Sequence, residues 1–355
     1  MLDRVSRPSY AGLMNKLDRN DRAKILHLLC EGQSIRSVVR LTGASKNTIA
    51  RLLIDAGRAC AEYQDRALRN LTCKRVQVDE IWSFIYSKQS QVAGAKSAPK
   101  HAGDVWTWTA IDADTKLLVS WLVGKRDTYN AMEFLADLKS KLTNRVQLTS
   151  DGHRSYLVAV DSVFGDNVDY AMLVKLYGPT LEGERRYSPP VCVGARRRKL
   201  IGAPDPKHVS TSFAERQNLT MRMHMRRFTR LTNAFSKKIE NHSYAVALHA
   251  MYYNFVRQHQ TLRVSPAMAA GVTDKLWEIE DIVAMIEAWE AEQATAGITY
   301  EVSKNKIGGG LFVKISPRYG KPETVYGFGT LEAANAYVLE SRESHKPGRK
   351  RKIAS

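Results

Sequence analysis

The chain has 355 residues, a length at which two or three domains are expected. It carries 54 Lys and Arg against 36 Asp and Glu, a formal net charge of +18. No apolar run reaches the roughly 20 residues of a membrane span, and the four cysteines form no Cys-x-x-Cys pair. These facts speak against a membrane protein, a zinc ribbon and a disulfide scaffold. The positive charge predicts nucleic acid as the first partner to consider, ahead of an anionic membrane surface.

Residues 1–60 are predicted to form a helix-turn-helix domain. Apolar residues recur at helical spacing from Asp21 to Glu31, and Ser34 and Ser45 are the expected caps of two further helices. The turn between them is Thr42-Gly43-Ala44. The outer face of the third helix would present residue types that contact phosphates and base edges, namely Lys46, Asn47, Thr48 and Arg51. A plain three-helix bundle fits the same pattern, but the turn spacing and the basic face favour DNA binding.

Residues 61–75 are predicted as a helical connector, and Val76–Ile85 as a core strand because it is rich in β-branched and aromatic residues. This strand carries Asp79 and Glu80, two charges that are costly to bury without partners. Neighbouring side chains of a strand point to opposite faces, so we expect that the two carboxylates cannot serve one site. The pair is either a solvated pair on an edge strand, or it includes a ligand for a hard divalent cation.

Residues 76–270 are predicted as one α/β domain, whose strands form a mixed five-stranded sheet with flanking helices. Two strands, Asp104–Ile111 and Leu117–Val123, are expected to pair as a hairpin. The elements expected after the hairpin are a helix over Thr128–Leu142, a strand over Arg145–Thr149, a helix over Ser155–Phe164 and a strand over Tyr170–Tyr177. Two more helices are expected over Phe213–Leu231 and Phe235–His259.

The pattern of strands and helices breaks at residues 178–210, a predicted basic insertion with five prolines. It contains the cluster Arg196, Arg197, Arg198 and Lys199. From Lys175 to Arg230 there are 13 Lys and Arg against 4 Asp and Glu, a net charge of +9. Such a run is usually a solvated face, but beside a candidate catalytic sheet it indicates a track for a polyanion.

Three segments are predicted to follow the α/β domain. Residues 271–297 hold an acidic amphipathic helix, with its apolar face over Asp274–Ala294. Residues 298–341 are expected to be a small α+β unit with two strands around a Gly308-Gly309-Gly310 turn and one helix, and residues 342–355 a basic disordered tail. The acidic helix is expected to pack on the α/β domain rather than bind another subunit, and the tail either aids DNA affinity or has no specific role. No chemistry can be assigned to residues 298–341 from their sequence.

Two further carboxylates bear on Asp79. Asp151 ends a predicted core strand, a position where α/β proteins place ligands. Glu215 lies in the first turn of a predicted helix, where Ser212-x-x-Glu215 also fits a capping box that would only satisfy a backbone donor. Asn218 and Arg222 share the helical stripe of Glu215, an arrangement that suits a site for both metal and phosphodiester.

Asp79, Asp151 and Glu215 are therefore candidate ligands for two Mg²⁺ ions, which prefer carboxylate oxygens to His or Cys. Two such ions activate a water or a sugar 3′-hydroxyl and stabilise the leaving oxygen of a phosphodiester. The sequence contains neither a Walker-type phosphate loop nor a local Ser/His/Asp signature that would point to other chemistry.

Three stretches together resemble the DDE transposases of bacterial insertion sequences, most closely the IS-one-like branch, over about residues 20–275. They are the segment from Val78 to Phe84, Ser150-Asp151-Gly152, and Glu215-Arg216-Gln217-Asn218 with Arg222. The resemblance implies a ribonuclease-H-like fold and Mg²⁺-dependent cleavage and strand transfer, with Mn²⁺ able to substitute. It implies a homo-oligomer acting on double-stranded DNA, at transposon ends and target, in the bacterial cytoplasm at the nucleoid. Asp79, Asp151 and Glu215 would be the catalytic and metal-binding triad.

Two features depart from that family. The chain lacks the N-terminal Cys-based zinc element common in this branch, so recognition of transposon ends would rest on the helix-turn-helix, and residues 298–341 have no counterpart. His153 and His259 are expected to be structural or DNA-contacting rather than metal ligands. The rival hypotheses are a DNA-binding remnant or regulator without catalysis, and a ribonuclease-H-like nuclease without strand transfer. The complete triad argues against the first, and the helix-turn-helix against the second.

Overall fold

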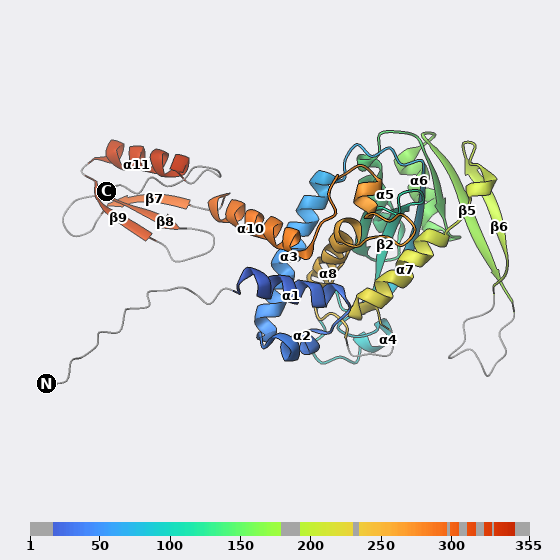
Figure 1. Cartoon of the computed structure of the whole chain (residues 1–355), viewed down its shortest axis with the longest axis horizontal. Coiled ribbons are helices and arrows are strands. Elements are labelled where there is room, and N and C mark those ends of the chain that lie inside the picture. Colours follow the sequence, from blue (N-terminus) through green and yellow to red (C-terminus); the bar gives the residue numbers. More distant parts are fainter. Residues whose placement is uncertain are drawn as a thin grey trace. The chain divides into compact units, whose positions relative to one another are not determined.

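The computed structural model describes residues 17–178, 192–229, 234–296, 299–304, 311–316, 323–328 and 330–344. The chain divides into two compact units, Met1–Val283 and Ala284–Ser355. Within the described ranges, no helix is long and apolar enough to cross a membrane. The candidate site residues all belong to the first unit, whose elements are labelled in Figure 1.

Three helices open the first unit, as predicted: α1 (Arg19–Cys30), α2 (Ile35–Thr42) and α3 (Lys46–Ala67). The hydroxyls of Ser34 and Ser45 accept backbone N–H groups and cap α2 and α3, which confirms both expected caps. Gly43 ends α2 with φ 74°, in the left-handed region that favours glycine. Helix α3 spans 22 residues and continues into the expected connector as far as Ala67, so its outer face and the first part of that connector are one helix.

Helix α3 packs along α8 (Ile239–Met251) of the same unit (Figure 1). Gly57 lies so close to Tyr244 that a Cβ at this position would clash with it. Arg58 Nε donates to the Tyr244 hydroxyl at 3.1 Å, and Gln64 donates to a backbone carbonyl of α8 at 3.1 Å. Helix α3 is therefore fixed against α8 by side-chain contacts.

A mixed six-stranded sheet with the order β3-β2-β1-β4-β5-β6 forms the centre of the first unit. Its strands are β1 (Arg75–Ile85), β2 (Gly103–Asp112), β3 (Leu118–Gly124), β4 (Val146–Ser150), β5 (Val168–Tyr177) and β6 (Cys192–Ile201). Strand β4 is parallel to β1 and β5, and the other neighbouring pairs are antiparallel. The predicted hairpin and the first five strands are confirmed. The order is compatible with the ribonuclease-H-like arrangement that the resemblance implies.

The predicted count of five strands is wrong, because part of the expected basic insertion is strand β6. Arg196, Arg197, Arg198 and Lys199 lie on β6, and all four are exposed. An edge strand of this kind takes its hydrogen bonds from β5 and buries neither face, so it needs no alternation of apolar residues. The strand could therefore not be recognised from its hydrophobic pattern, because its central residues are charged. Residues 179–191 of the expected insertion lie outside the described residues.

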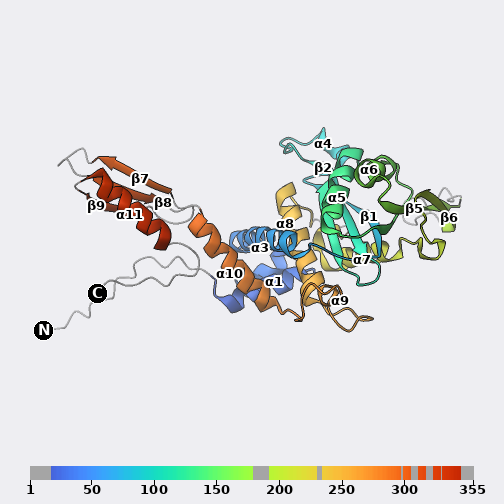
Figure 2. The same cartoon turned by 90° about the horizontal axis from the view of Figure 1, so that it is seen from above.

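Helices cover both faces of the sheet (Figure 2). Helices α5 (Thr128–Lys141) and α6 (Ser155–Phe164) contribute Phe134 and Tyr156, which pack their rings on Trp108. On the other face, α7 (Ser212–His224) and α8 bury Met221 and Val246 against Ile81. Alternate residues of β1 therefore face different helical layers, and this decides the surroundings of Asp79 and Glu80.

Several shorter elements complete the first unit: α4 (Gln89–Val92), α9 (Pro266–Ala269), 3₁₀ turns at Pro206–His208 and Arg226–Phe228, and a π-helix at Tyr252–Val256. The two expected long helices are thus shorter than predicted, since α7 ends at His224 and α8 is followed by the π-helix. The expected acidic helix is α10 (Ile279–Ala296), which begins five residues later than the predicted apolar face.

The second unit is of the predicted α+β class. Strands β7 (Thr299–Lys304), β8 (Leu311–Ser316) and β9 (Glu323–Phe328) form an antiparallel sheet, followed by α11 (Leu331–Ser344). Val313 packs with Ala334 and Val338 of α11 in a small core. The prediction missed β9. The expected Gly308–Gly310 turn and the basic segment from Lys346 to Lys352 lie outside the described residues.

Candidate active site

Asp79 and Asp151 lie side by side on adjacent parallel strands. The last paired residues of β1 and β4 are Gln77 and Thr149, so the register puts Asp79 level with Asp151, which directly follows β4. From this point β1 continues to β2 on one side of the sheet, and β4 continues to β5 on the other. A change of direction of this kind leaves a crevice at the carboxyl ends of the strands, where α/β proteins bind ligands.

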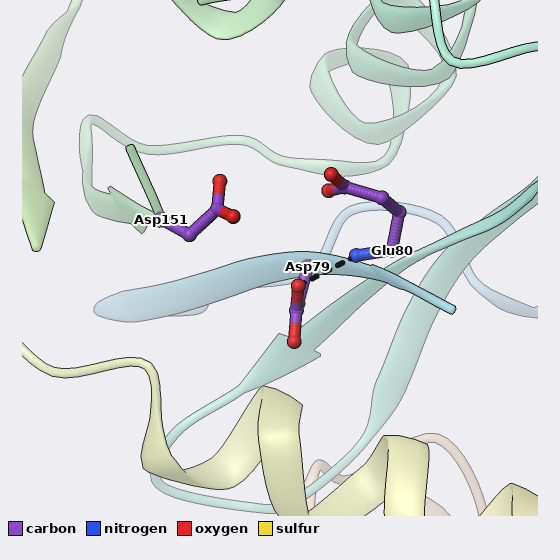
Figure 3. A group of neighbouring side chains, drawn as sticks. All are labelled: Asp79, Glu80 and Asp151. Atoms are coloured by element: carbon purple, nitrogen blue, oxygen red, sulfur yellow. Dashed lines mark hydrogen bonds between the residues drawn. The ribbon is translucent and has the colours of Figure 1, made fainter. Parts of the chain in front are cut away.

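One carboxylate oxygen from each of Asp79, Glu80 and Asp151 lies within 4.8 Å of the others (Figure 3). Asp79 and Glu80 leave opposite sides of β1, Asp79 toward α7 and Glu80 toward α6, as strand alternation predicts (Figure 3). The Asp79 carboxylate turns along the strand and accepts the backbone N–H of Glu80 at 2.8 Å. Asp79 and Glu80 are expected not to serve one site, because they leave opposite faces of β1. This expectation is wrong, because one oxygen of each carboxylate lies within 4.8 Å of the other.

Asp79 is half-buried among groups of like charge. Besides the Glu80 N–H, its carboxylate accepts the side-chain amide of Asn218 at 2.8 Å. Burial, and then the charges of Glu80, Asp151 and Glu215, raise the pKa of Asp79 to about 7, against the lowering effect of the Glu80 N–H. A carboxylate in these surroundings favours a proton or a cation.

Glu80 has its own positively charged partner. Its side chain is 1% exposed, and its Oε1 accepts Arg126 Nε at 2.6 Å and lies 2.5 Å from Nη2. Its Oε2 accepts the Tyr156 hydroxyl at 3.1 Å. The Arg126 guanidinium also lies over the Trp106 ring, 4.6 Å from its centre, and 3.9 Å from Asp151 Oδ2. Burial and the charge of Asp151 raise the pKa of Glu80, while Arg126 and Tyr156 oppose the rise. Glu80 thus holds Arg126 in place.

Glu215 lies near this cluster but is not one of its three members. Its Oε2 forms an ion pair with Lys175 Nζ at 2.6 Å, and its Oε1 accepts the Thr211 hydroxyl at 2.5 Å. The capping box that Ser212 would allow is not formed, since α7 begins at Ser212 and the residue that caps it is Thr211. The structure brings Asp79 and Asp151 together and leaves Glu215 within electrostatic range of Asp79.

The residues predicted to contact DNA lie in three places. Lys46, Asn47 and Arg51 are exposed on the first turns of α3, and Thr48 is half-buried there. The cluster Arg196–Lys199 is exposed on β6. Asn218 is buried and donates to Asp79, and Arg222 is half-buried one turn further along α7. Contact of any of them with DNA stays a prediction.

A cavity of about 460 Å³ opens beside Asp151, between the loop that follows β4 and the end of β5. Its lining includes three cationic side chains, two apolar ones and an aromatic ring, namely Arg126, Arg154, Lys175, Leu173, Val174 and Tyr177. None of these was predicted as a site residue, although Lys175 begins the predicted basic track. Arg126 and Lys175 come from segments far from the acidic motifs along the chain, and no spacing pattern connects them with Asp79.

The backbone N–H of His153 donates to Asp151 Oδ1 at 2.9 Å, which fixes the Asp151 carboxylate at the end of β4. Burial lowers the pKa of the His153 imidazole, and the charge of Arg126 lowers it further. The nearby carboxylates offer hard oxygen donors, the ligand type that Mg²⁺ and Mn²⁺ prefer. The chemistry of the donor set therefore fits a divalent metal ion.

No family model matches the sequence, and no curated protein matches it. Among solved structures, the chain is similar to the cryo-EM structure of a piggyBac transposase synaptic complex with hairpin DNA. That similarity has a TM-score of 0.35 at 8% sequence identity, and it covers 80% of this chain and 74% of that chain. At these values it carries no argument about family or activity, so the function must be argued from the site itself.

Proposed function

We propose that the chain is a DDE-type DNA transposase, which binds the ends of an insertion sequence and joins them to target DNA. The observation that carries this proposal is the meeting of Asp79 and Asp151 at the point where the pairing of β1 with β4 ends. Helix α7 supports it, because it lies on the Asp79 side of the sheet and carries Glu215. The strand order β3-β2-β1-β4-β5-β6 is compatible with a ribonuclease-H-like catalytic domain.

In this proposal Asp79, Asp151 and Glu215 hold two divalent ions, Mg²⁺ or Mn²⁺. The raised pKa of Asp79 supports it, since excess negative charge in a half-buried site is relieved by a divalent cation. When bound, the ions would activate a water or a DNA 3′-hydroxyl and stabilise the leaving oxygen. Glu215 contributes a ligand only after it leaves Lys175, and the released Lys175 ammonium then becomes available to a DNA phosphate.

Two exposed basic surfaces would hold the DNA. The start of α3 offers Lys46 and Arg51 to transposon ends, as the helix-turn-helix reading predicts. The β6 cluster Arg196–Lys199 offers four adjacent cations to a phosphate backbone. A net charge of +18 suits a double-stranded DNA partner. Because an insertion sequence has two ends, the active species is proposed to be a homo-oligomer.

The decisive experiment is a cleavage and strand-transfer assay on DNA that carries the inverted repeats flanking the gene. Wild type is compared with Asp151→Ala and with Asp161→Ala, a control at an exposed aspartate of α6. Joined products that require Mg²⁺ and vanish only in Asp151→Ala would support the proposal. Cutting without joining would indicate a nuclease, and binding without cutting would indicate a DNA-binding regulator.

A further inference from the structure

We propose that the cavity beside Asp151 is a nucleotide subsite for a DNA strand, with Arg126 as its fixed phosphate ligand and Tyr177 as the surface for the base. The proposal deepens the function proposed above and rests on it in naming a DNA strand as the ligand. It assigns roles to Glu80, Arg126 and Tyr177 that the acidic triad leaves unexplained.

The first argument is that Arg126 is held rigidly. Two of its nitrogens contact the buried Glu80 carboxylate, and its plane lies on the Trp106 ring. A guanidinium has five N–H donors in a fixed fork, so a carboxylate that takes one edge leaves further donors for a phosphate. Because Arg126 lines the cavity, the side chain that Glu80 fixes is presented to a ligand there. The conformational entropy of this long side chain is therefore already lost in the free protein, so its ordering does not oppose ligand binding.

The second argument concerns the charge of the cavity. Arg126, Arg154 and Lys175 line it together with the carboxylate of Asp151, while Glu80 and Glu215 pair with Arg126 and Lys175. The cationic side chains of the lining offer several N–H donors to an anionic ligand, and a volume near 460 Å³ falls in the range of small-molecule sites, roughly 300–1,000 Å³. Lys175 is shared with Glu215 at 2.6 Å, so its contribution increases if Glu215 turns to a metal.

The third argument selects a nucleotide over a bare phosphate. The lining also includes apolar side chains of β5, those of Leu173 and Val174, and at the end of this strand the aromatic residue Tyr177, which is 57% exposed. An exposed aromatic ring beside basic side chains is the combination on which bases of single-stranded DNA stack. A site that binds inorganic phosphate alone does not need these apolar and aromatic side chains.

The fourth argument is position. Asp151 belongs both to the cavity lining and to the carboxylate cluster with Asp79. A strand with one nucleotide in the cavity therefore passes directly by the candidate metal ligands. Glu80, whose oxygens are occupied by Arg126 and Tyr156, acts here as a positioning residue that orients the phosphate ligand.

The test is photo-crosslinking of the full chain to a short single-stranded oligonucleotide that carries 4-thiothymidine, in EDTA so that catalysis plays no part. Mass spectrometry reports crosslinks in Leu173–Tyr177 separately from those on other basic surfaces. We expect a crosslink in this segment that falls about tenfold in Arg126→Gln, the effect of losing one charge-assisted hydrogen bond. The control Lys125→Gln removes the same charge at the neighbouring exposed position and should leave the yield unchanged.

Tyr156→Phe tests the positioning role without a change of buried charge. Loss of the hydroxyl that donates to Glu80 should lower the Leu173–Tyr177 crosslink severalfold, while urea unfolding shows that the variant is still folded under the assay conditions. Arg126→Lys should not restore the yield, because an ammonium cannot contact Glu80 with two nitrogens and stack on Trp106. Full recovery by lysine would contradict a fixed guanidinium.

Three outcomes would overturn the subsite. They are no crosslink in Leu173–Tyr177, equal losses in Arg126→Gln and Lys125→Gln, and competition by inorganic phosphate as strong as that by unlabelled oligonucleotide. Because the assay is run without metal, these outcomes leave the transposase test untouched. Conversely, if the crosslink behaves as expected but the chain cuts no DNA, the proposed subsite is supported and the proposed transposase function is wrong.

Discussion

The two sides of β1 each carry a carboxylate, and their surroundings are opposite in charge. On the α7 side, Asp79 accepts an amide and a backbone N–H, and the negative charges of Glu80, Asp151 and Glu215 all raise its pKa. On the α6 side, Glu80 meets a guanidinium and a phenol hydroxyl. Asp79 is left with negative charge that a cation can neutralise, whereas Glu80 is already neutralised. Adjacent acidic residues on one strand can therefore serve as a metal ligand and as a support.

The largest effect should separate these two roles in catalysis. Asp79→Asn should reduce Mg²⁺-dependent DNA cleavage by about a thousandfold or more, because it removes a charged ligand of the metal ions. Glu80→Gln should reduce it by only about tenfold, through the weakened hold on Arg126. Cleavage rates at saturating DNA measure both. Equal losses would show that the two sides of β1 have the same function.

The next effect concerns pH and metal. The folded-state pKa of Asp79 is raised from 3.8 to about 7, so its charged form is disfavoured in the folded protein. This group's contribution to stability is therefore lost as the pH rises from about 4 through 7 in metal-free protein. In wild type, the free energy of unfolding by urea in EDTA should fall over this window. In Asp79→Asn the fall should be smaller by a few kcal/mol.

Mg²⁺ should reverse that loss, because it binds the deprotonated carboxylates. The rise in Tm on adding Mg²⁺ should be larger at about pH 8 than at about pH 5, and Asp79→Asn should remove most of the difference. Asp161→Asn, at an exposed position of α6, is the matched control. A rise in Tm that does not depend on pH would remove the link between Asp79 and metal binding.

A smaller effect is expected on the folding of the α6 side. Glu80→Gln should destabilise the protein by about 1–3 kcal/mol, since Arg126 loses its charged partner, and Tyr156→Phe by about 1 kcal/mol. A double-mutant cycle of Glu80→Gln with Arg126→Gln, read by urea unfolding, should show coupling between the two sites. Strict additivity would mean that the ion pair contributes nothing to the fold.

The smallest effect should come from Asn218. Its amide donates to the charged form of Asp79, so Asn218→Ala should raise the pKa of Asp79 further. The acid limb of the pH–rate profile should then move to higher pH, with a loss of activity of about twofold to fivefold near neutrality. Thr220→Ala, on the same helix, is the control. An unchanged acid limb would indicate that Asn218 does not influence Asp79.

Much of the local structure could be predicted from the residues. Ser34 and Ser45 cap the helices where expected, the hairpin pairs as expected, and Asp151 follows its strand directly. The missed strand of the central sheet, β6, shows no regular apolar alternation. Strand β6 carries four consecutive charged residues, Arg196 to Lys199, on faces that are not buried, and its pairing with β5 is a property of the sheet.

The sequence by itself determined which residue types are available: Asp79 and Glu80 on one strand, Asp151 after another, Glu215 in the first turn of a helix. Local rules of strand alternation and capping suffice for this, because they act over a few residues. Only the tertiary structure decided which charges meet. Arg126 neutralises Glu80, Lys175 holds Glu215, and Asp79 keeps an uncompensated charge. These pairings join elements distant along the chain, and the energy of a charge depends on its neighbours in space.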